Sequence, residues 1–306
     1  MLSRKNRLLL LKVLSLFSVV RGYNVLIILV AQYLASIFIL SPDLPLGKII
    51  FDLNLFFIVL ASSLVIASGY IINNFYDAEK DLINKPRKSM LDRLVSQRFK
   101  LTTYFLLNLL AVFVASYVSF RAVLFFSAYI FGIWLYSHKL KKVPFVGNVV
   151  SVTLSIAPFF AVFVYYKNFQ TDIFVHALFL FCLMLAREII KDLENIAGDL
   201  AHGYRTIPII YGTVISKVVI TVVVLLTLLP SWLLIENFNV GRMDYYFKAC
   251  MGVLLLFLVL LWRSNTKKEY VWLHNILKLI IVFGVFSIVL IDLDLVIDRL
   301  RIWKIT

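Results

Sequence analysis

The chain has 306 residues, of which 62% are hydrophobic and 16% are charged, against about 45–50% and about 25% in a soluble globular domain. This composition excludes a water-soluble fold, because too little polar surface remains to cover the apolar side chains. The formal charge of +14 does not indicate nucleic-acid binding, since the basic residues lie in short segments between apolar runs, where they orient a membrane protein.

The apolar runs are about 20 residues long, which is the length of a helix that crosses the hydrocarbon core of a bilayer. A helix satisfies its own backbone hydrogen bonds in lipid, so the sequence predicts an all-α integral membrane protein. Nine transmembrane helices are expected, in chain order, near 15–40, 53–76, 101–119, 121–137, 146–165, 172–190, 213–235, 245–262 and 271–291. No linker separates these runs, and we expect a single domain over residues 1–306.

Lysine and arginine are distributed unevenly between the segments that connect the predicted helices. Alternate segments carry 21 of these residues on one side and 8 on the other. The positive-inside rule therefore predicts a multi-pass protein of the cell membrane with a cytoplasmic N-terminus. An odd number of helices then places the C-terminus outside.

Acidic residues gather in two of the basic segments, both on the predicted cytoplasmic side. The first cluster is 73-NNFYDAEKD-81, in which Asn73, Asp77 and Asp81 are four residues apart. On a helix this spacing puts the three side chains on one face, with Asn74 next to them.

The second cluster is 187-REIIKDLENIAGD-199, and its acidic and amide side chains follow a similar helical spacing. They are Glu188, Asp192, Asn195 and Asp199. Like charges at this spacing repel each other unless a cation lies between them. Hard oxygen ligands from two helices suit Mg²⁺, which shares its remaining positions with water and phosphate oxygens. The pair of clusters therefore predicts a Mg²⁺-dependent site for a diphosphate.

Cations and hydrogen-bond donors that suit a diphosphate lie around both clusters. They are Arg21 and Asn24 at the start of the first span, Lys85 and Arg87 after the first cluster, Lys141, and Arg187 with Lys191 at the second. Most of these residues also fit a simple role in membrane orientation. Arg21 is the exception, because an arginine followed by an apolar run is costly unless it faces a polar cavity.

These residues resemble the motifs of the UbiA-type intramembrane prenyltransferases. The first family motif, N-D-x-x-D-x-x-x-D, is similar to residues 73–81, with Asn74 in place of the first aspartate. The second, D-x-x-D-x-x-x-D, is similar to residues 192–199, with Asn195 at the middle position. Shorter matches are 21-RGYN-24, 84-NKPR-87, 136-YSHKLK-141 and 203-GYRTIP-208. The run 187-REIIKD-192 looks most like the enzymes that prenylate geranylgeranylglyceryl phosphate.

The resemblance implies that Mg²⁺ joins a polyprenyl diphosphate to Asp77, Asp81, Asp192 and Asp199, which would be both the metal ligands and the catalytic residues. The implied substrate-binding residues are Arg21, Asn24, Asn73, Asn74, Lys85, Arg87, Tyr136, Lys141, Arg187, Lys191 and Asn195. The leaving diphosphate would be neutralised by Mg²⁺ and by nearby cations, and an allylic cation would be attacked by a lipophilic acceptor. Aromatic side chains, with Phe75, Tyr76 and Tyr136 as candidates, could stabilise that cation.

Three alternatives remain open from the sequence. The acceptor could be an aromatic quinone precursor instead of a prenylglyceryl phosphate. A solute transporter also fits many spans and charged residues, but its site would lie near the midplane on broken helices. A non-catalytic membrane relative is favoured slightly by the two asparagines that replace aspartates, Asn74 and Asn195. No feature of the sequence indicates a protein partner.

Overall fold

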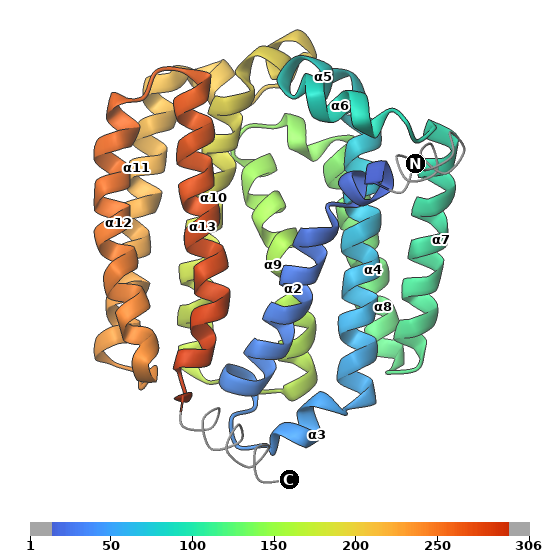
Figure 1. Cartoon of the computed structure of the whole chain (residues 1–306), viewed down its shortest axis with the longest axis vertical. Helices are drawn as coiled ribbons and strands as arrows, with labels where there is room; N and C mark the ends of the chain where they lie inside the picture. The colour runs from blue at the N-terminus through green and yellow to red at the C-terminus, as the bar shows by residue number, and fades with distance from the viewer. Residues whose placement is uncertain (1–13, 294–306) are drawn as a thin grey trace, which may run out of the picture.

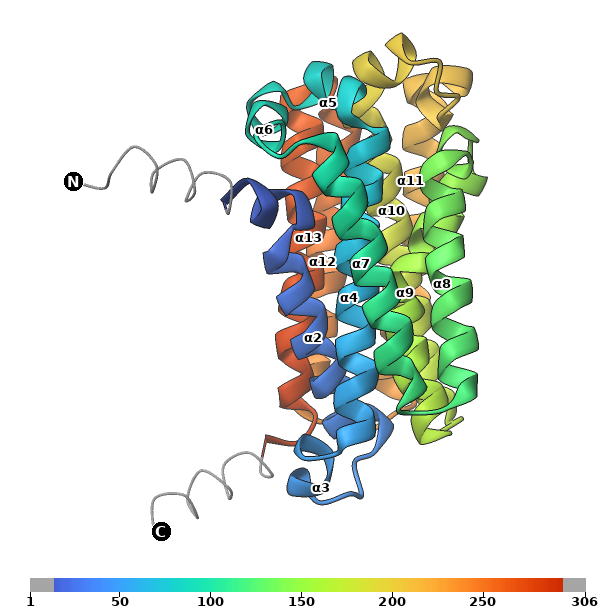
Figure 2. The same cartoon turned by 90° about the vertical axis from the view of Figure 1, so that its right-hand side faces the viewer.

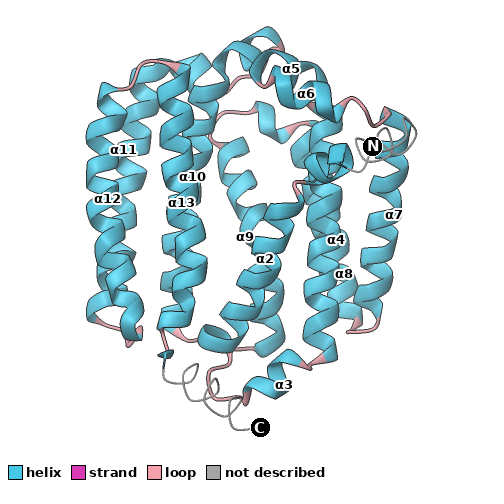
Figure 3. Cartoon of the chain, viewed as in Figure 1, coloured by secondary structure: helices cyan, strands magenta, loops and turns pink. Residues whose placement is uncertain are grey.

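The computed structural model describes residues 14–293, which form helices joined by loops and turns, with no strand in that range (Figure 3). Nine helices in this part of the chain are long and apolar enough to cross a membrane. They are α2 (Gly22–Ala35) continued by η1 (Ser36–Leu40), α4 (Leu53–Tyr76), α7 (Gln97–Ser116), α8 (Phe120–His138), α9 (Val146–Tyr166), α10 (Thr171–Ala201), α11 (Ile207–Glu236), α12 (Asp244–Arg263) and α13 (Lys267–Ser287). The predicted all-α membrane fold is confirmed. The basic residues before residue 14, and the C-terminal residues from 294 onward, lie outside the described range.

Five shorter helices complete the described chain, and one helical segment at 14–20 precedes α2. They are α3 (Leu46–Ile50), α5 (Ala78–Asn84), α6 (Pro86–Asp92), η2 (Leu140–Lys142) and η3 (Gly241–Met243), with a final turn η4 (Ile288–Leu290). Side chains cap the N-termini of several long helices by accepting hydrogen bonds from backbone N–H groups. Asp52 does so for α4, Ser96 for α7, and Thr266 forms a capping box with Glu269 at α13.

The first and the sixth predicted spans depart most from the observed helices. The first span is not continuous, because Arg21 has a left-handed backbone (φ 50°, ψ 51°) that separates segment 14–20 from α2. A non-glycine residue rarely takes this conformation. The sixth span was expected to end at residue 190, but α10 continues as far as Ala201. Hydropathy misses this extension because its buried residues include charged ones.

The long helices pack as two groups with a shared middle. One apolar core is formed by α10, α11, α12 and α13, and a second by α4, α7, α8 and α9 with parts of α2. In Figure 1 the first group lies on the left and α4, α7 and α8 lie on the right, with α2 and α9 between them. Figure 2 shows the same helices running roughly parallel along the long axis.

The short helices α5 and α6 cover one end of this bundle. Helix α5 follows α4 directly, turns across the end of the bundle and packs against α10 (Figure 1). This end also holds the C-terminal half of α10, so the fold brings both acidic clusters to the same end of the molecule. The opposite end carries α3 and the turn η3.

Candidate active site

Asp77 lies between the last residue of α4 and the first residue of α5, at the end of the bundle that α5 and α6 cover. Its backbone (φ −92°, ψ 2°) interrupts the helix that the spacing predicts over residues 73–81. The hydrogen bonds of a helix nevertheless continue through the joint, from Asp77 N to Asn73 O (2.9 Å) and from Asp81 N to Asp77 O (2.8 Å). Asp77 is therefore held in place, while α5 bends away from the axis of α4.

Asp77 is 7% exposed, and its carboxylate is surrounded by donors from three other places in the chain. Its Oδ1 accepts hydrogen bonds from Lys141 Nζ (2.7 Å) and the Tyr204 hydroxyl (3.0 Å), and it lies 3.3 Å from Lys80 Nζ. Burial acts to raise the pKa of Asp77, but the charges of Lys141 and Lys80 outweigh it and lower the pKa to about 2. The carboxylate is thus kept ionised at neutral pH.

Lys80 joins the two acidic clusters. Its Nζ lies 3.3 Å from Asp77 Oδ1 and 3.2 Å from Asp199 Oδ1, which comes from the last turn of α10. Its ammonium also lies over the Tyr204 ring, 4.3 Å from the centroid. Asp77 and Asp199, which are 122 residues apart in the chain, therefore face the same cation.

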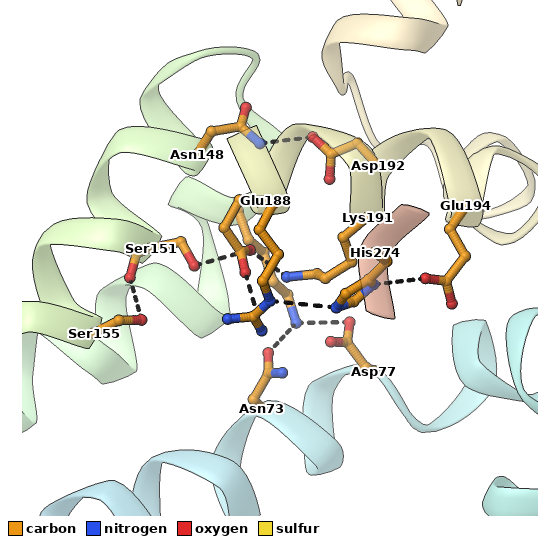
Figure 4. Close-up of polar contacts among 12 residues, drawn as sticks. Asn73, Asp77, Asn148, Ser151, Ser155, Glu188, Lys191, Asp192, Glu194 and His274 are labelled. Carbon is orange, nitrogen blue, oxygen red and sulfur yellow. Dashed lines mark hydrogen bonds and ion pairs between the residues drawn. The ribbon is translucent and has the colours of Figure 1, made fainter. Parts of the chain in front are cut away.

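The rest of the second cluster runs along α10 toward the middle of the bundle. Asp192 accepts a hydrogen bond from Asn148 Nδ2 of α9 (2.7 Å). One turn earlier, Glu188 accepts from the Ser151 hydroxyl (3.1 Å) and pairs with Lys191. Figure 4 shows Glu188 and Lys191 pointing into the space between α10 and the end of α4, with Asp192 turned toward Asn148.

A second chain of polar contacts joins α10 to α13. His274 Nδ1 lies 2.9 Å from Glu194 Oε2, and Arg187 Nε donates to His274 Nε2 (3.3 Å). Lys85 Nζ approaches the same Glu194 carboxylate at 3.9 Å. Burial lowers the pKa of Lys85, and Glu194 offsets only part of that effect. Helix α13, which carries no recognisable motif, thus contributes the His274 side chain to the second acidic cluster.

Arg21 and Asn24 lie deeper, at the start of α2, and both contact Tyr70 of α4. The Arg21 guanidinium is 5.0 Å from the centre of the Tyr70 ring, and Asn24 Nδ2 donates to the Tyr70 hydroxyl (3.2 Å). Tyr70 precedes Asp77 by two helical turns, about 10 Å along α4. Arg21 is also close enough to Lys85 to disfavour its charge.

The other predicted site residues fall into three groups. Asn73 and Tyr136 lie near the acidic residues, because Asn73 Oδ1 accepts from Lys141 Nζ (3.3 Å) and Tyr136 lies near Lys191. Arg87 is exposed on α6. The Asn74 amide does not contact Asp77 or Asp81: its Nδ2 donates to Asp92 (2.8 Å) and its Oδ1 accepts from Lys100 (2.8 Å).

The Asn195 amide oxygen is buried and meets no hydrogen-bond donor within residues 14–293. The side chain is 6% exposed. Nowhere in the described residues do three histidine, cysteine or acidic side chains come close enough to hold a metal by themselves. The site thus contains oxygen atoms that could bind a hard cation, but the protein alone does not supply a complete set of metal ligands in the described residues.

An apolar cavity of about 200 Å³ lies between α2, α9, α10, α12 and α13, on the side of the acidic clusters that faces the opposite end of the bundle. Its walls include Phe163, Phe179, Leu183, Tyr246 and Phe247. Leu183 is five residues from Glu188, about 8 Å along α10. The cavity thus begins roughly one and a half turns below the polar cluster.

Residues 25–280 match the model of a known protein family, the UbiA prenyltransferase family. The chain belongs to the UbiA prenyltransferase family. The match spans both acidic clusters and all nine long helices except the first turn of α2 and the last turns of α13.

Among UbiA family proteins, several curated relatives cover most of the chain. A digeranylgeranylglyceryl phosphate synthase of Methanobrevibacter smithii is 28% identical over 284 residues, which is 88% of this chain and 95% of the relative. The protein of the same name from Thermococcus gammatolerans is 30% identical over 247 residues, 80% of this chain and 86% of its own.

Solved UbiA structures have the same fold. A structure described as digeranylgeranylglyceryl phosphate synthase superposes with a TM-score of 0.69 at 21% identity, covering 92% of this chain and 98% of the other. A UbiA homologue from Archaeoglobus fulgidus, described as bound to GPP and Mg²⁺, gives a TM-score of 0.65 at 14% identity, with 90% and 99% covered.

Several residues that the sequence did not single out contact the two acidic clusters, among them Tyr204, Lys80, Asn148 and His274. Tyr204 stands inside the run 203-GYRTIP-208 and could have been found there. Lys80 precedes Asp81 directly, but a basic residue in a basic loop gives no signal of its own. Asn148 and His274 lie in spans without a motif, and only the packing of α9 and α13 against α10 brings them in.

Proposed function

We propose that this protein transfers a prenyl group from a polyprenyl diphosphate to the hydroxyl group of a lipophilic acceptor, and that the acceptor is geranylgeranylglyceryl phosphate. One observation carries the proposal: Asp77 and Asp199, from the two family motifs, face each other across a single ammonium group inside an apolar bundle. Carboxylates and cations gathered in this way suit the diphosphate end of an isoprenoid substrate.

The residues present fit a Mg²⁺ ion that is shared with the substrate. Mg²⁺ is commonly held by one or two carboxylates, with water and phosphate oxygens filling its other positions. We propose that the ligands come from Asp77, Asp81, Asp192 and Asp199, with each Mg²⁺ ion held by one or two of these carboxylates and completed by phosphate oxygens and water. The Asn195 oxygen, which has no hydrogen-bond partner among the described residues, is a further oxygen in the second cluster that could bind a hard cation. When bound, Mg²⁺ would neutralise charge on the leaving diphosphate.

The cations of the chain would stabilise the same developing charge. The bond between the allylic carbon and the diphosphate oxygen breaks, the acceptor oxygen forms the new bond to that carbon, and the acceptor hydroxyl loses its proton. Lys80 and Lys141 already lie against Asp77, and Arg187 and Lys191 lie beside Glu188. We propose that they donate to the diphosphate, together with Lys85, Arg87 and Asn73, while Arg21, Asn24 and Tyr136 border the first isoprene units.

The apolar cavity beyond Leu183 has the position and the chemistry to take the isoprenoid tail. Its lining is almost entirely aliphatic and aromatic, and the loss of water from such a space protects an allylic cation from hydrolysis. A donor that lies along α10 would place its diphosphate at Asp192 and Asp199 and its tail toward Phe179 and Phe247.

The choice of acceptor is supported by the relatives and by charge. Proteins named digeranylgeranylglyceryl phosphate synthase match this chain over most of its length. Exposed basic residues beyond those assigned to the diphosphate also lie at this end of the bundle, among them Lys139, Lys142 and Arg205. An acceptor with its own phosphate would use this excess of positive charge, whereas a hydroxybenzoate carries a single negative charge. The positive-inside rule puts this end in the cytoplasm.

A side-by-side assay tests the acceptor. The protein in lipid vesicles would receive geranylgeranyl diphosphate and Mg²⁺, with geranylgeranylglyceryl phosphate, 4-hydroxybenzoate or a hydroxynaphthoate as acceptor. We expect the prenylated glyceryl phosphate as the product, with one diphosphate released for each transfer. Product from either aromatic acid, with none from the glyceryl phosphate, would overturn the lipid acceptor and leave prenyl transfer intact.

A further inference from the structure

Asn74 takes part in a polar cluster that is separate from the aspartates of the candidate site. This group, the Asn74 cluster, consists of Ser18, Asn74, Lys88, Asp92 and Lys100. Its members come from four parts of the chain: segment 14–20, α4, α6 and α7. The cluster lies on the side of α4 that faces the N-terminal segment, where Asp92 and Lys100 are 3% and 1% exposed.

Every polar atom of the Asn74 side chain is used inside this cluster. Asn74 Nδ2 donates to Asp92 Oδ2 (2.8 Å), and Lys100 Nζ donates to Asn74 Oδ1 (2.8 Å). The Ser18 hydroxyl donates to Asp92 Oδ1 (2.9 Å), and Lys88 pairs with Asp92 Oδ2. The amide therefore stands between a carboxylate and an ammonium that are both buried.

This position requires an amide for a simple chemical reason. An amide donates a hydrogen bond and accepts one at the same time, whereas an ionised carboxylate can only accept. A carboxylate at position 74 would keep the contact with Lys100 but would place an oxygen against Asp92 Oδ2, where the Nδ2 donor now lies. Two buried carboxylate oxygens at this distance repel each other strongly.

The Asn74 cluster holds one end of the segment that covers the site. Residues 77–96, which we call the cap, contain α5 and α6 and carry Lys80, Asp81 and Lys85. At its α5 end the cap is held to α10, where Asn84 Oδ1 accepts from Gly198 N (3.0 Å), and to α13, where Lys267 Nζ donates to Asn84 O (2.8 Å). At its α6 end it is held by Asp92.

We propose that Asn74 is a positioning residue that fixes the cap over the diphosphate site through Asp92, and that it is not a metal ligand. The inference rests on the proposed prenyl transfer for its kinetic consequences. Its structural basis is independent of that function, because Asn74 contacts Asp92 and Lys100 and none of the acidic residues proposed to bind the diphosphate.

An exchange of the two side chains tests this role. Asn74→Asp alone should raise the KM for geranylgeranyl diphosphate about tenfold and change kcat much less, because a hydrogen bond to a charged group is lost. It should also speed tryptic cleavage within residues 77–96. The double variant Asn74→Asp/Asp92→Asn restores one donor and one acceptor at the contact, and both its KM and its cleavage rate should return toward wild type.

Asn239→Asp is the matched control, since Asn239 is exposed at the opposite end of the bundle and its oxygen accepts a hydrogen bond from the nearby Gly241 N. It should leave KM and cleavage unchanged. An Asn74→Asp variant that binds Mg²⁺ more tightly, with an unchanged cap, would make position 74 a metal ligand and overturn the proposal. So would an exchange variant no better than the single one. If wild-type protein made no product, prenyl transfer itself would fail, but cleavage of the cap would still test the Asn74 contact.

Discussion

Asp77 is held by donors from three separate segments, since Lys80, Lys141 and Tyr204 all approach the same carboxylate oxygen. Two ammonium groups around one buried carboxylate are costly for folding, because each buried charge loses several kcal/mol of hydration free energy. The arrangement keeps Asp77 ionised, as the Mg²⁺ ligand that we propose it to be must be.

Asp77→Asn should lower turnover by about a hundredfold or more, because a charged group that acts on the transition state is replaced by a neutral one. The amide oxygen can still accept from Lys141 and Tyr204, so the protein should remain folded. The measurement is the initial rate of prenyl transfer together with the elution profile in size-exclusion chromatography. Asp192→Asn should behave in the same way.

Asp244→Asn is a suitable control, because Asp244 forms an ion pair with Lys248 at the other end of the bundle (2.6 Å). We expect the wild-type rate from this variant. Near-full activity of Asp77→Asn would remove that residue from the catalytic site.

Sequence spacing predicts which residues share a helix face, but it does not predict what faces them. Asn73, Asp77 and Asp199 were expected at the site, and the structure places them around Lys141 and Lys80. Asn74 was expected with them, yet its amide meets Asp92 and Lys100 instead, because the direction of α4 relative to α6 and α7 is set by packing. Spacing within one segment carries no information about that direction.

At the scale of helices, hydropathy predicts the spans well where apolar residues decide the helix, as in α4, which was expected at 53–76 and is observed there. Hydropathy predicts the helix bounds poorly where polar contacts determine them. The break at Arg21 and the extension of α10 to Ala201 both lie at the polar end of the bundle. These two departures are also the places where the chain reaches the candidate site.

The contact between α5 and α10 depends on the absence of a side chain at Gly198. A Cβ atom there would lie 2.4 Å from Asn84 Nδ2, and the Asn84 side chain is already held by the Gly198 backbone. Gly198→Ala should therefore lower the free energy of unfolding by about 1–3 kcal/mol, as overpacking does. Thermal unfolding in detergent measures the change.

The double variant Gly198→Ala/Asn84→Ala removes the clash and should recover part of the lost stability. Gly252→Ala is the control, because a Cβ atom at that position on α12 has no neighbour within 4 Å, and alanine favours a helix interior over glycine. Equal stability of Gly198→Ala and Gly252→Ala would show that α5 does not pack on α10 as described.

For the whole molecule, two groups of helices bring two acidic clusters to one end, and the cap joins the groups across that end (Figure 1). The distribution of lysine and arginine predicts that this end faces the cytoplasm. Single cysteines introduced at Met90 and at Asn239, which are both exposed and lie at opposite ends, can be labelled in intact cells with a membrane-impermeant thiol reagent. We expect labelling of Asn239→Cys and not of Met90→Cys. The reverse pattern would place the site outside.

Mg²⁺-dependent release of diphosphate tests the central claim most directly. Purified protein in lipid vesicles would receive geranylgeranyl diphosphate and geranylgeranylglyceryl phosphate, with Mg²⁺ or with EDTA, and both the diphosphate and the lipid product would be measured. We predict equal amounts of the two products with Mg²⁺, neither with EDTA, and a return of activity when Mg²⁺ is restored. A properly folded protein that releases no diphosphate with Mg²⁺, whatever the acceptor, would contradict the account.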